Sequence, residues 1–520
     1  MQAAEPRAPL ALWLTGLQPR AVAGLAVLAG ISTGAGQAPL SAWPLALAGL
    51  ALAMGLFLAA ADIRGAGWRF WLFGLGYFTA TLFWIVEPFM VDPLRHGWMA
   101  PFALVFMAGG MALFWGAAGA LARYLAGNAP PWRALAALVL TLSGAELLRS
   151  YIFTGFPWAL ISYIWIGAAP AQMAAVIGPH GLVLVTLVIV ALLALALWRG
   201  RFMGMIWPVV ALAAIWAYGL QALRGPEPAA TGAIVRVVQP NAPQHQKWQP
   251  EYAQLFFDRL LEFTAAPGAG DARPDLVIWP ETAIPLWLDQ AEGAMALMAE
   301  AAGGTRLVFG VNAYDAPRAY NAMVVLGGDG TLIARYDKYR LVPFGEYIPA
   351  GGLLSRIGFR AFTQQAGYGF SPGPGSEQMA LGAAGNALPL ICYEAIFPQA
   401  MRGAGRPDWL MQITNDAWFG ALAGPQQHLA QARMRAIEQG LPLIRSANTG
   451  ISAVIDTRGR IVRQIALNEA GWFDTVLPGP ASPTPYARTG DWPMGALVLA
   501  GLAALMLRRA GSGKLAANRI

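Results

Sequence analysis

Seven long apolar stretches within residues 1–223 constrain this fold more than any other feature of the sequence. A stretch of about 20 apolar residues is long enough to cross a bilayer as an α-helix. An eighth apolar stretch returns near the end of the chain. We therefore predict a polytopic α-helical membrane bundle of eight spans, near residues 21–38, 43–61, 70–90, 100–122, 132–150, 174–198, 203–222 and 493–507.

The composition supports a membrane location and indicates a second body. Charged residues make up 12% of the chain, about half of the roughly 25% that is usual in soluble domains. One long segment before the last apolar stretch differs, because it has ordinary polar content and strand-sized apolar runs. The predicted parts are a seven-span membrane domain, a linker, an extramembrane domain, a connector, a last span and a tail, over 1–223, 224–231, 232–478, 479–492, 493–507 and 508–520.

Basic residues at the span ends predict how the chain crosses the membrane. Lys and Arg favour the cytoplasmic side of a span, and an eight-span layout puts most of them on one side. We therefore predict cytoplasmic termini, a first span that is retained, and an extracytoplasmic domain at 232–478. The residues on the shared side are Arg7, Arg20, Arg64, Arg69, Arg123, Arg133, Arg199, Arg201, Arg508, Arg509, Lys514 and Arg519.

Two charged residues of opposite sign lie within the fifth predicted span. Glu146 and Arg149 are one helical turn apart. Ionisable residues at membrane depth are functional candidates by default. A structural ion pair at the level of the lipid headgroups is the alternative.

The segment 232–478 has the pattern of an α/β domain. Short runs rich in β-branched residues alternate with stretches of helical periodicity, which favours a sheet flanked by helices. We expect strands near 233–241, 275–279, 306–309, 322–326, 331–334, 388–392, 409–413 and 451–455. Helices are expected near 250–265, 289–302 and 425–440.

The only cysteine of the chain, Cys392, ends one of these predicted strands and precedes Tyr393 and Glu394. A lone cysteine is often a small buried apolar residue, but one at a strand end beside a carboxylate is a candidate nucleophile. Glu281 follows another predicted strand. Lys338, one of only three lysines, follows a third. These residues supply a nucleophile, a base and a compact amine.

The motifs around these residues resemble the nitrilase superfamily. They are Trp279-Pro-Glu281, Asp337-Lys-Tyr-Arg-Leu-Val-Pro-Phe-Gly-Glu346 and Ile391-Cys-Tyr-Glu394. Within that superfamily the chain is similar to the apolipoprotein N-acyltransferases. The runs that carry this likeness are Leu341-Val-Pro-Phe-Gly-Glu-Tyr-Ile-Pro349, Thr414-Asn-Asp-Ala-Trp-Phe-Gly420 and Thr484-Pro-Tyr-Ala-Arg-Thr-Gly490.

The resemblance implies an α-β-β-α sandwich domain that transfers an acyl chain from a phospholipid, through a cysteine thioester. The acceptor would be the N-terminal amine of S-diacylglyceryl-cysteine lipoproteins, at the periplasmic face of a bacterial inner membrane. Glu281 would be the base, Lys338 would stabilise the thiolate and the oxyanion, and Cys392 would be the nucleophile. The supporting residues would be Glu346, Glu394 and Tyr393, the last through its backbone N–H, and the substrate-binding residues would be Trp248, Asn321, Trp418 and Phe419. Gln426 stands where we would expect an aromatic residue.

Other functions compete with this one. A membrane-tethered amidase that takes a small soluble amide is the main alternative, and a transporter with an inactive nitrilase-like domain is another. A Cys–His pair with His428 is less favoured, because no orienting carboxylate is close to His428 in sequence. We expect no cofactor, no metal, no nucleic acid, and a monomer.

Overall fold

The computed structural model describes residues 9–268, 273–349, 369–403 and 405–517. The chain divides into two compact units, Met1–Gly225 with Thr484–Ile520, and Pro226–Pro483. The chain crosses from the first unit to the second within the predicted linker at 224–231, and it crosses back within the predicted connector at 479–492.

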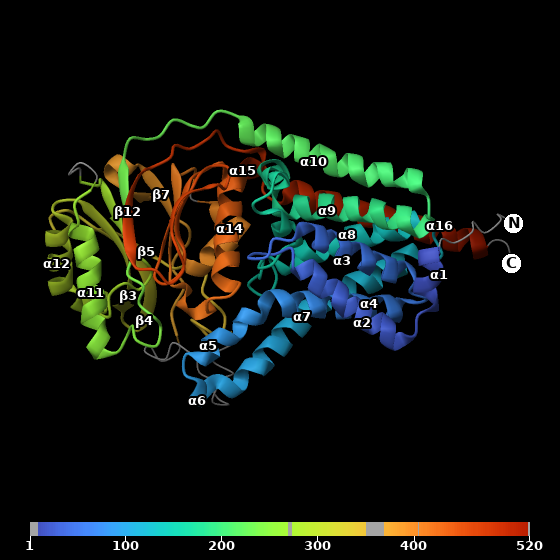
Figure 1. Cartoon of the computed structure of the whole chain (residues 1–520), viewed down its shortest axis with the longest axis horizontal. Helices are drawn as coiled ribbons and strands as arrows, with labels where there is room; N and C mark the ends of the chain where they lie inside the picture. The colour runs from blue at the N-terminus through green and yellow to red at the C-terminus, as the bar shows by residue number, and fades with distance from the viewer. Residues whose placement is uncertain (1–8, 269–272, 350–368, 404, 518–520) are drawn as a thin grey trace. The chain divides into compact units, whose positions relative to one another are not determined.

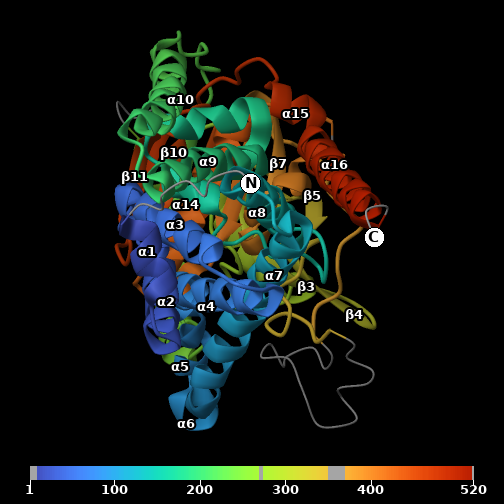
Figure 2. The ribbon, with the colours of Figure 1, turned by 90° about the vertical axis from the view of Figure 1, so that its right-hand side faces the viewer.

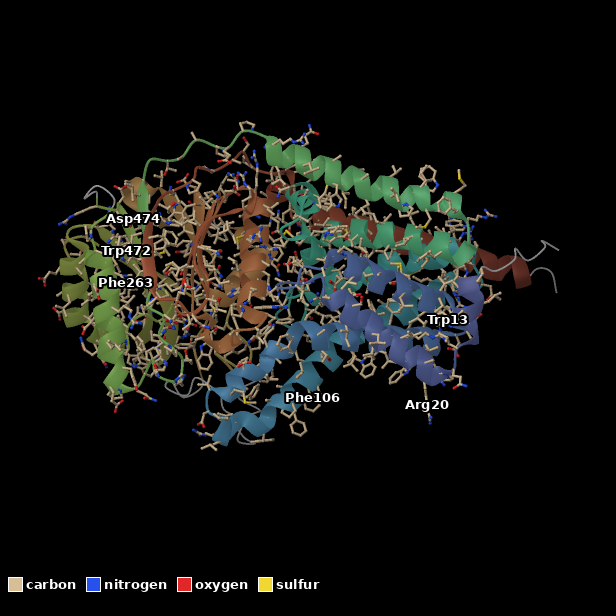
Figure 3. The ribbon with its side chains drawn as sticks, in the orientation of Figure 1. Trp13, Arg20, Phe106, Phe263, Trp472 and Asp474 are labelled. Atoms are coloured by element: carbon tan, nitrogen blue, oxygen red, sulfur yellow. The ribbon has the colours of Figure 1, made fainter. Side chains whose placement is uncertain are left out.

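The first unit is a bundle of apolar helices. Helix α4 packs against both α2 and α7, and α8 packs against α7, α9 and α16 (Figure 2). Large apolar side chains such as Trp13 and Phe106 project from the outside of this bundle, as in a protein whose solvent is lipid (Figure 3). Its helices are α1 (Pro9–Gly16), α2 (Pro19–Gly34), α3 (Trp43–Leu58), α4 (Ile63–Leu82), α5 (Glu87–Met90), α6 (Pro93–His96), α7 (Ala100–Ala126), α8 (Pro131–Arg149), α9 (Ala174–Arg199), α10 (Ile206–Arg224), α15 (Pro485–Thr489) and α16 (Trp492–Ala517).

Six helical segments among the described residues are long and apolar enough to cross a membrane. The pair α1 and α2 is bent by 115° and would make a seventh if it were one span. Helix α3 has 16 residues, so at 1.5 Å per residue it is about 24 Å long, less than the roughly 30 Å of a hydrocarbon core. The prediction of eight spans therefore stays a prediction. The six segments are Ile63–Met90, Pro93–Ala126, Pro131–Arg149, Ala169–Arg199, Phe202–Arg224 and Trp492–Arg509.

Glu146 and Arg149 form an ion pair that is fully buried inside the bundle, with 2.7 Å between Arg149 Nε and Glu146 Oε1. Trp115 Nε1 donates a hydrogen bond to Glu146 at 2.9 Å. Arg149 Nη1 donates to the backbone carbonyls of Phe156 and Trp158 at 2.7 and 2.9 Å. The pair thus holds the polar loop after α8 inside an apolar bundle, where its carbonyls would otherwise lack partners.

A second buried network joins α8, α9 and the start of the last helix. His180 Nδ1 lies 2.9 Å from Asp491 Oδ1, and His180 Nε2 lies 2.9 Å from Ser150 Oγ. The hydroxyl of Tyr486 donates to Asp491 at 3.1 Å. The Tyr486 ring covers Gly178, which breaks α9 with φ 69°, and a Cβ at Gly178 would lie 2.1 Å from that ring.

The second unit contains two six-stranded sheets, in the orders β12-β1-β2-β3-β4-β5 and β11-β10-β9-β8-β7-β6. Each has a parallel centre, β1-β2-β3 or β7-β8-β9, with antiparallel strands outside it. The strands are β1 (Ile234–Gln239), β2 (Leu276–Ile278), β3 (Arg306–Asp315), β4 (Arg318–Leu326), β5 (Leu332–Asp337), β6 (Met379–Ala380), β7 (Asn386–Ile391), β8 (Trp409–Thr414), β9 (Leu443–Ala447), β10 (Ser452–Ile455), β11 (Ile461–Ile465) and β12 (Gly471–Val476).

Alternation along the strands places the cores of this unit. Val235 and Val237 of β1 belong to the core between the two sheets, whereas Val238 packs toward α11 (Pro250–Ala265) and α12 (Glu292–Ala302). Helix α14 (Gly424–Gln439) packs on the outer face of the other sheet. Figure 1 shows these helices on opposite sides of the paired sheets. Period-two alternation sends neighbouring side chains to opposite faces, so each strand serves two cores.

Each strand and helix expected in this segment overlaps an observed one, and four strands were missed. β6 has only two residues. β9 contains Arg445, and β11 and β12 each contain a charged residue as well. Because a charge interrupts a short apolar run, these segments resemble loops in sequence.

Arg236 shows what such a charge does inside a sheet. It lies on β1 and donates to Asp474 of β12 at 2.7 Å. Its guanidinium is 4.0 Å from the ring centroid of Trp472, and it donates to the carbonyl of Phe263 near the end of α11 at 3.2 Å. Figure 3 shows Phe263, Trp472 and Asp474 gathered at this place. Arg236 therefore ties the edge strand and α11 to the centre of the sheet.

Candidate active site

The three residues of the predicted catalytic set lie just beyond strand ends. Glu281 follows β2, Lys338 directly follows β5, and Cys392 directly follows β7. Cys392 has φ 51°, in the left-handed region that non-glycine residues seldom occupy. It begins a short 3-10 helix, Cys392–Ile396. Such strain is common at functional sites, because the surrounding structure fixes one side chain there.

A buried hydrogen-bond network fixes the carboxylate of Glu281. Its Oε1 accepts from Asn321 Nδ2 at 2.7 Å and lies 3.5 Å from Lys338 Nζ. Its Oε2 accepts from the backbone N–H of Asn415 at 2.8 Å. Asn321 also reaches Glu346 Oε1, at 3.1 Å. The predicted base thus has a fixed orientation, and the structure places Asn321 beside it.

Lys338 is buried between two carboxylates. Its Nζ donates to Glu346 Oε1 at 2.8 Å, and Glu346 Oε2 accepts from the backbone N–H of Val342 at 2.8 Å. Burial opposes the charge of Lys338, but the charges of Glu346 and Glu281 outweigh it and raise the pKa of the ammonium. Lys338 is therefore a permanent cation at this site, suited to stabilise an anion.

The thiol of Cys392 is buried and coupled electrostatically to both charged residues. Burial raises the pKa of this thiol, and the charge of Glu281 raises it further, while Lys338 acts in the opposite direction. The resting nucleophile is therefore a neutral thiol. It needs a base to take its proton as it attacks. Two carboxylates act on the thiol electrostatically, Glu281 more strongly and Asp416 less.

Glu394 connects the loop after β5 to the loop that carries Cys392. Its Oε1 accepts from Tyr336 Oη and from the backbone N–H groups of Tyr339 and Arg340 at 2.8, 2.8 and 3.1 Å. Its Oε2 accepts from the backbone N–H of Ile391 at 2.7 Å. Through these hydrogen bonds Glu394 holds the loop after β5 against the loop that carries Cys392.

His428 lies close to the nucleophile, but it contacts the backbone of Cys392. His428 Nε2 is 3.1 Å from the carbonyl oxygen of Cys392, and Nδ1 is 2.9 Å from Asp416 Oδ1. Arg445 pairs with the same carboxylate. No carboxylate is close to His428 in sequence, but the fold brings Asp416, 12 residues earlier in the chain, to its Nδ1. The contact with the Cys392 carbonyl still favours a role in which His428 supports the nucleophile loop.

The aromatic candidates lie around this network. Trp418 and Phe419 end a 3-10 helix, Asp416–Phe419, directly after the Asn415 N–H that binds Glu281. The Phe419 ring centroid is 5.5 Å from that of His428. Trp248 is partly exposed, and its ring centroid lies 5.0 Å from Lys247 Nζ.

Sequence reasoning overlooked Lys247. Its Nζ donates to the backbone carbonyl of Glu281 at 3.2 Å, and the side chain is buried. Burial lowers the pKa of Lys247 to about 8, against a smaller opposite effect of Glu281. The scarcity of lysine in this chain was the available signal, and it was applied only to Lys338.

No cluster of three or more His, Cys, Asp or Glu residues that could hold a metal ion occurs in the part of the chain that the structure describes.

Comparison with known families assigns both units. Residues 234–477 match the carbon-nitrogen hydrolase family, and residues 29–192 match the apolipoprotein N-acyltransferase N-terminal domain. An apolipoprotein N-acyltransferase of Caulobacter vibrioides is 40% identical over 478 residues, which cover 86% of this chain and 87% of that protein. One of Rhodopseudomonas palustris is 39% identical over 467 residues, with 85% and 86% covered. The chain belongs to the apolipoprotein N-acyltransferase family.

Two of the solved structures that resemble the chain each cover about half of it. A CN-hydrolase superfamily protein from Xanthomonas campestris has 19% identity and a TM-score of 0.35, covering 51% of this chain and 96% of that one. A mutant amidase of the nitrilase superfamily from Nesterenkonia has 17% identity and a TM-score of 0.37, with 52% and 99% covered. Membership of the apolipoprotein N-acyltransferase family makes the chain an acyltransferase with a nitrilase-like domain and helices that can cross a membrane.

Proposed function

We propose that this enzyme moves an acyl chain from a membrane phospholipid to the N-terminal amine of a lipoprotein whose cysteine carries a diacylglyceryl group. Cys392 is the covalent carrier, Glu281 the base, and Lys338 the electrostatic stabiliser. The observation that supports this assignment best is the buried network in which Glu281 and Lys338 are coupled to a neutral thiol.

In the first half-reaction the sulfur of Cys392 attacks an ester carbonyl carbon while Glu281 accepts the thiol proton. Lys338 and the backbone N–H of Tyr393 stabilise the resulting oxyanion. The ester C–O bond then breaks, and the proton on Glu281 passes to the leaving alkoxide. The products are a thioester on Cys392 and a lysophospholipid.

In the second half-reaction the neutral amine of the acceptor attacks the thioester carbonyl. Glu281 accepts a proton from the amine, the C–S bond breaks, and the departing sulfur recovers that proton. The product is an amide. Since an α-amine has a pKa of about 8, this step slows as the pH falls below that value.

The membrane unit explains why an acyltransferase needs helices that a soluble amidase lacks. Donor tails and acceptor anchor remain in hydrocarbon while their reacting groups meet the thiol. We propose that the enzyme has eight spans and an α-β-β-α sandwich on the periplasmic side of the inner membrane. The linker at 224–231 and the connector at 479–492 separate the sandwich from the membrane domain. The enzyme is a monomer. Trp248, Trp418 and Phe419 would contact substrate, and Glu346 and Glu394 would position Lys338 and the nucleophile loop.

Mass spectrometry of Cys392 tests the proposal directly. Phospholipid without acceptor should add an acyl chain to Cys392 and release lysophospholipid in equal amount, and a diacylglyceryl peptide should then discharge the thioester. Cys392→Ser should form no adduct. Glu281→Gln and Lys338→Met should each slow thioester formation by about 100-fold or more, non-additively because they act together.

The control is Glu300→Gln, which makes the same change at an exposed position of α12 and should leave the rate unaltered. Absence of a thioester on folded wild-type enzyme contradicts the proposal. So does a thioester that water discharges as fast as the peptide, since that enzyme would be a hydrolase.

A further inference from the structure

A second feature of the catalytic unit has no part in the reaction described so far. A pocket of about 350 Å³ lies between three loop segments. Its volume falls within the roughly 300–1,000 Å³ that is typical of small-molecule sites. The polar residues that line it are Tyr339, Arg340, Ser376, Gln399 and Arg402.

The pocket is positively charged. Two arginines line it, and no acidic side chain does among the described residues around it. The Nε of Arg340 is buried and has no hydrogen-bond partner. The Arg340 guanidinium lies 4.4 Å from the ring centroid of Phe397, and that contact holds its plane without using its N–H groups.

The pocket adjoins the loops that carry the reacting groups. Tyr339 and Arg340 directly follow Lys338, and their backbone N–H groups are fixed by Glu394. The Phe397 ring that supports Arg340 packs edge-on against Tyr393, at 5.0 Å between centroids, and Tyr393 follows Cys392.

The third side of the pocket is also tied to the site. The backbone N–H of Gly373 donates to the carbonyl of Lys338 at 2.9 Å, and the segment continues to Ser376 at the pocket wall. The Ser376 hydroxyl donates to the carbonyl of Ala400, which joins two of the three loops. A group bound here would therefore lie beside the nucleophile loop.

We propose that this pocket binds the phosphate of the acyl donor. The inference rests on the proposed function. A planar guanidinium binds phosphate with two parallel hydrogen bonds, and two arginines match the charge of a phosphodiester. The ester carbonyls and the phosphorus of a phospholipid are only a few bonds apart on one glycerol, so a phosphate held here brings an ester to Cys392.

The phosphate site would answer a selectivity problem that the reaction poses. Donor and acceptor both carry fatty acyl esters on a glycerol unit, and only the donor carries a phosphate on that glycerol. A cationic pocket beside the loops that carry Lys338 and Cys392 lets the first half-reaction choose the donor. It gives the acceptor's own esters no such advantage.

The test compares two donors with identical acyl chains, phosphatidylglycerol and diacylglycerol, in mixed micelles with the full-length enzyme. The readout is the ratio of their kcat/KM values for thioester formation on Cys392. Arg340→Gln and Arg402→Gln should each lower this ratio about 10-fold, which corresponds to about 1.4 kcal/mol. Arg340→Lys should lie between wild type and Arg340→Gln, because it keeps the charge and loses the planar fork.

Arg318→Gln removes the same charge at an exposed position of β4 outside the pocket, and should leave the ratio as in wild type. If folded Arg340→Gln and Arg402→Gln both keep the wild-type ratio, the pocket does not bind the donor phosphate, while the proposed function stands. Failure of both donors to acylate wild-type Cys392 would overturn the proposed function as well.

The source of the phosphate is a separate arm of the experiment. Calorimetric titration with inorganic phosphate measures whether the pocket takes the free ion. If both arginine variants lose that binding but keep the wild-type donor ratio, the pocket holds free phosphate and the assignment to the donor lipid is overturned.

Discussion

Two buried lysines adjoin Glu281, and their surroundings give them opposite properties. Lys338 contacts the carboxylates of Glu346 and Glu281, so its charge is stabilised. Lys247 has one described hydrogen bond, to a backbone carbonyl, and burial lowers its pKa to about 8. A buried cation without a hydrogen-bonded carboxylate costs stability, so we expect Lys247 to weaken the fold at neutral pH, despite the Trp248 ring centroid 5.0 Å from its Nζ.

Lys247→Met should raise the melting temperature at pH 7. An unfolded lysine has a pKa of about 10.4 and the folded one about 8, so between these values the unfolded chain binds more protons. Wild-type stability should therefore rise as the pH goes from 8 to 10, whereas that of Lys247→Met should change less. The gain of the variant at pH 7 should be about 1–3 kcal/mol.

Thermal unfolding of the purified full-length enzyme at pH 7 and pH 10 measures both effects. The matched control is Arg259→Met, which removes another cation that donates to a backbone carbonyl, that of Pro240. A Lys247→Met protein that melts lower than wild type at pH 7 would show that the Lys247 ammonium stabilises the fold.

At the scale of elements, β12 and α11 depend on one side chain of β1. Arg236→Met leaves Asp474 without its ion pair and removes the donor to the Phe263 carbonyl. Loss of one partner of a buried pair costs about 3–5 kcal/mol. We expect a clear fall in the melting temperature of the catalytic unit.

Arg463→Met provides the comparison on a neighbouring strand. Arg463 also lies on an aromatic ring, that of Phe473 at 5.2 Å, but it is exposed and pairs with a carbonyl. Its loss should cost less than about 1 kcal/mol. Equal effects of the two variants in thermal unfolding would refute the special role of Arg236.

Local patterns account for the strands and helices that sequence reasoning found, and for Glu281, Lys338 and Cys392, because strand ends and motif spacing are local. Several of the missed features depend on long-range contacts. Asp416 and His428 meet only in the folded chain, and Lys247 is identified by burial against Glu281. The strand β9 carries Arg445, whose buried partner Asp416 makes a charge acceptable inside a sheet.

At the scale of the whole molecule, the arrangement of spans remains a prediction that charge distribution supports. A reporter inserted within residues 232–478 should be active outside the cytoplasm, and one fused after Ile520 should be active inside it. Alkaline phosphatase and a fluorescent protein are suitable reporters for the two sides. Finding both positions on the same side would exclude the eight-span layout.

The contact between His180 and Asp491 joins residues that are 311 positions apart. A ribosome must therefore complete the entire catalytic unit before the carboxylate that joins α8, α9 and the last helix exists. A chain truncated anywhere within that unit keeps the buried imidazole and lacks its acid. A truncated copy therefore lacks the carboxylate partner of a buried imidazole, and burying a polar group without its partner costs stability.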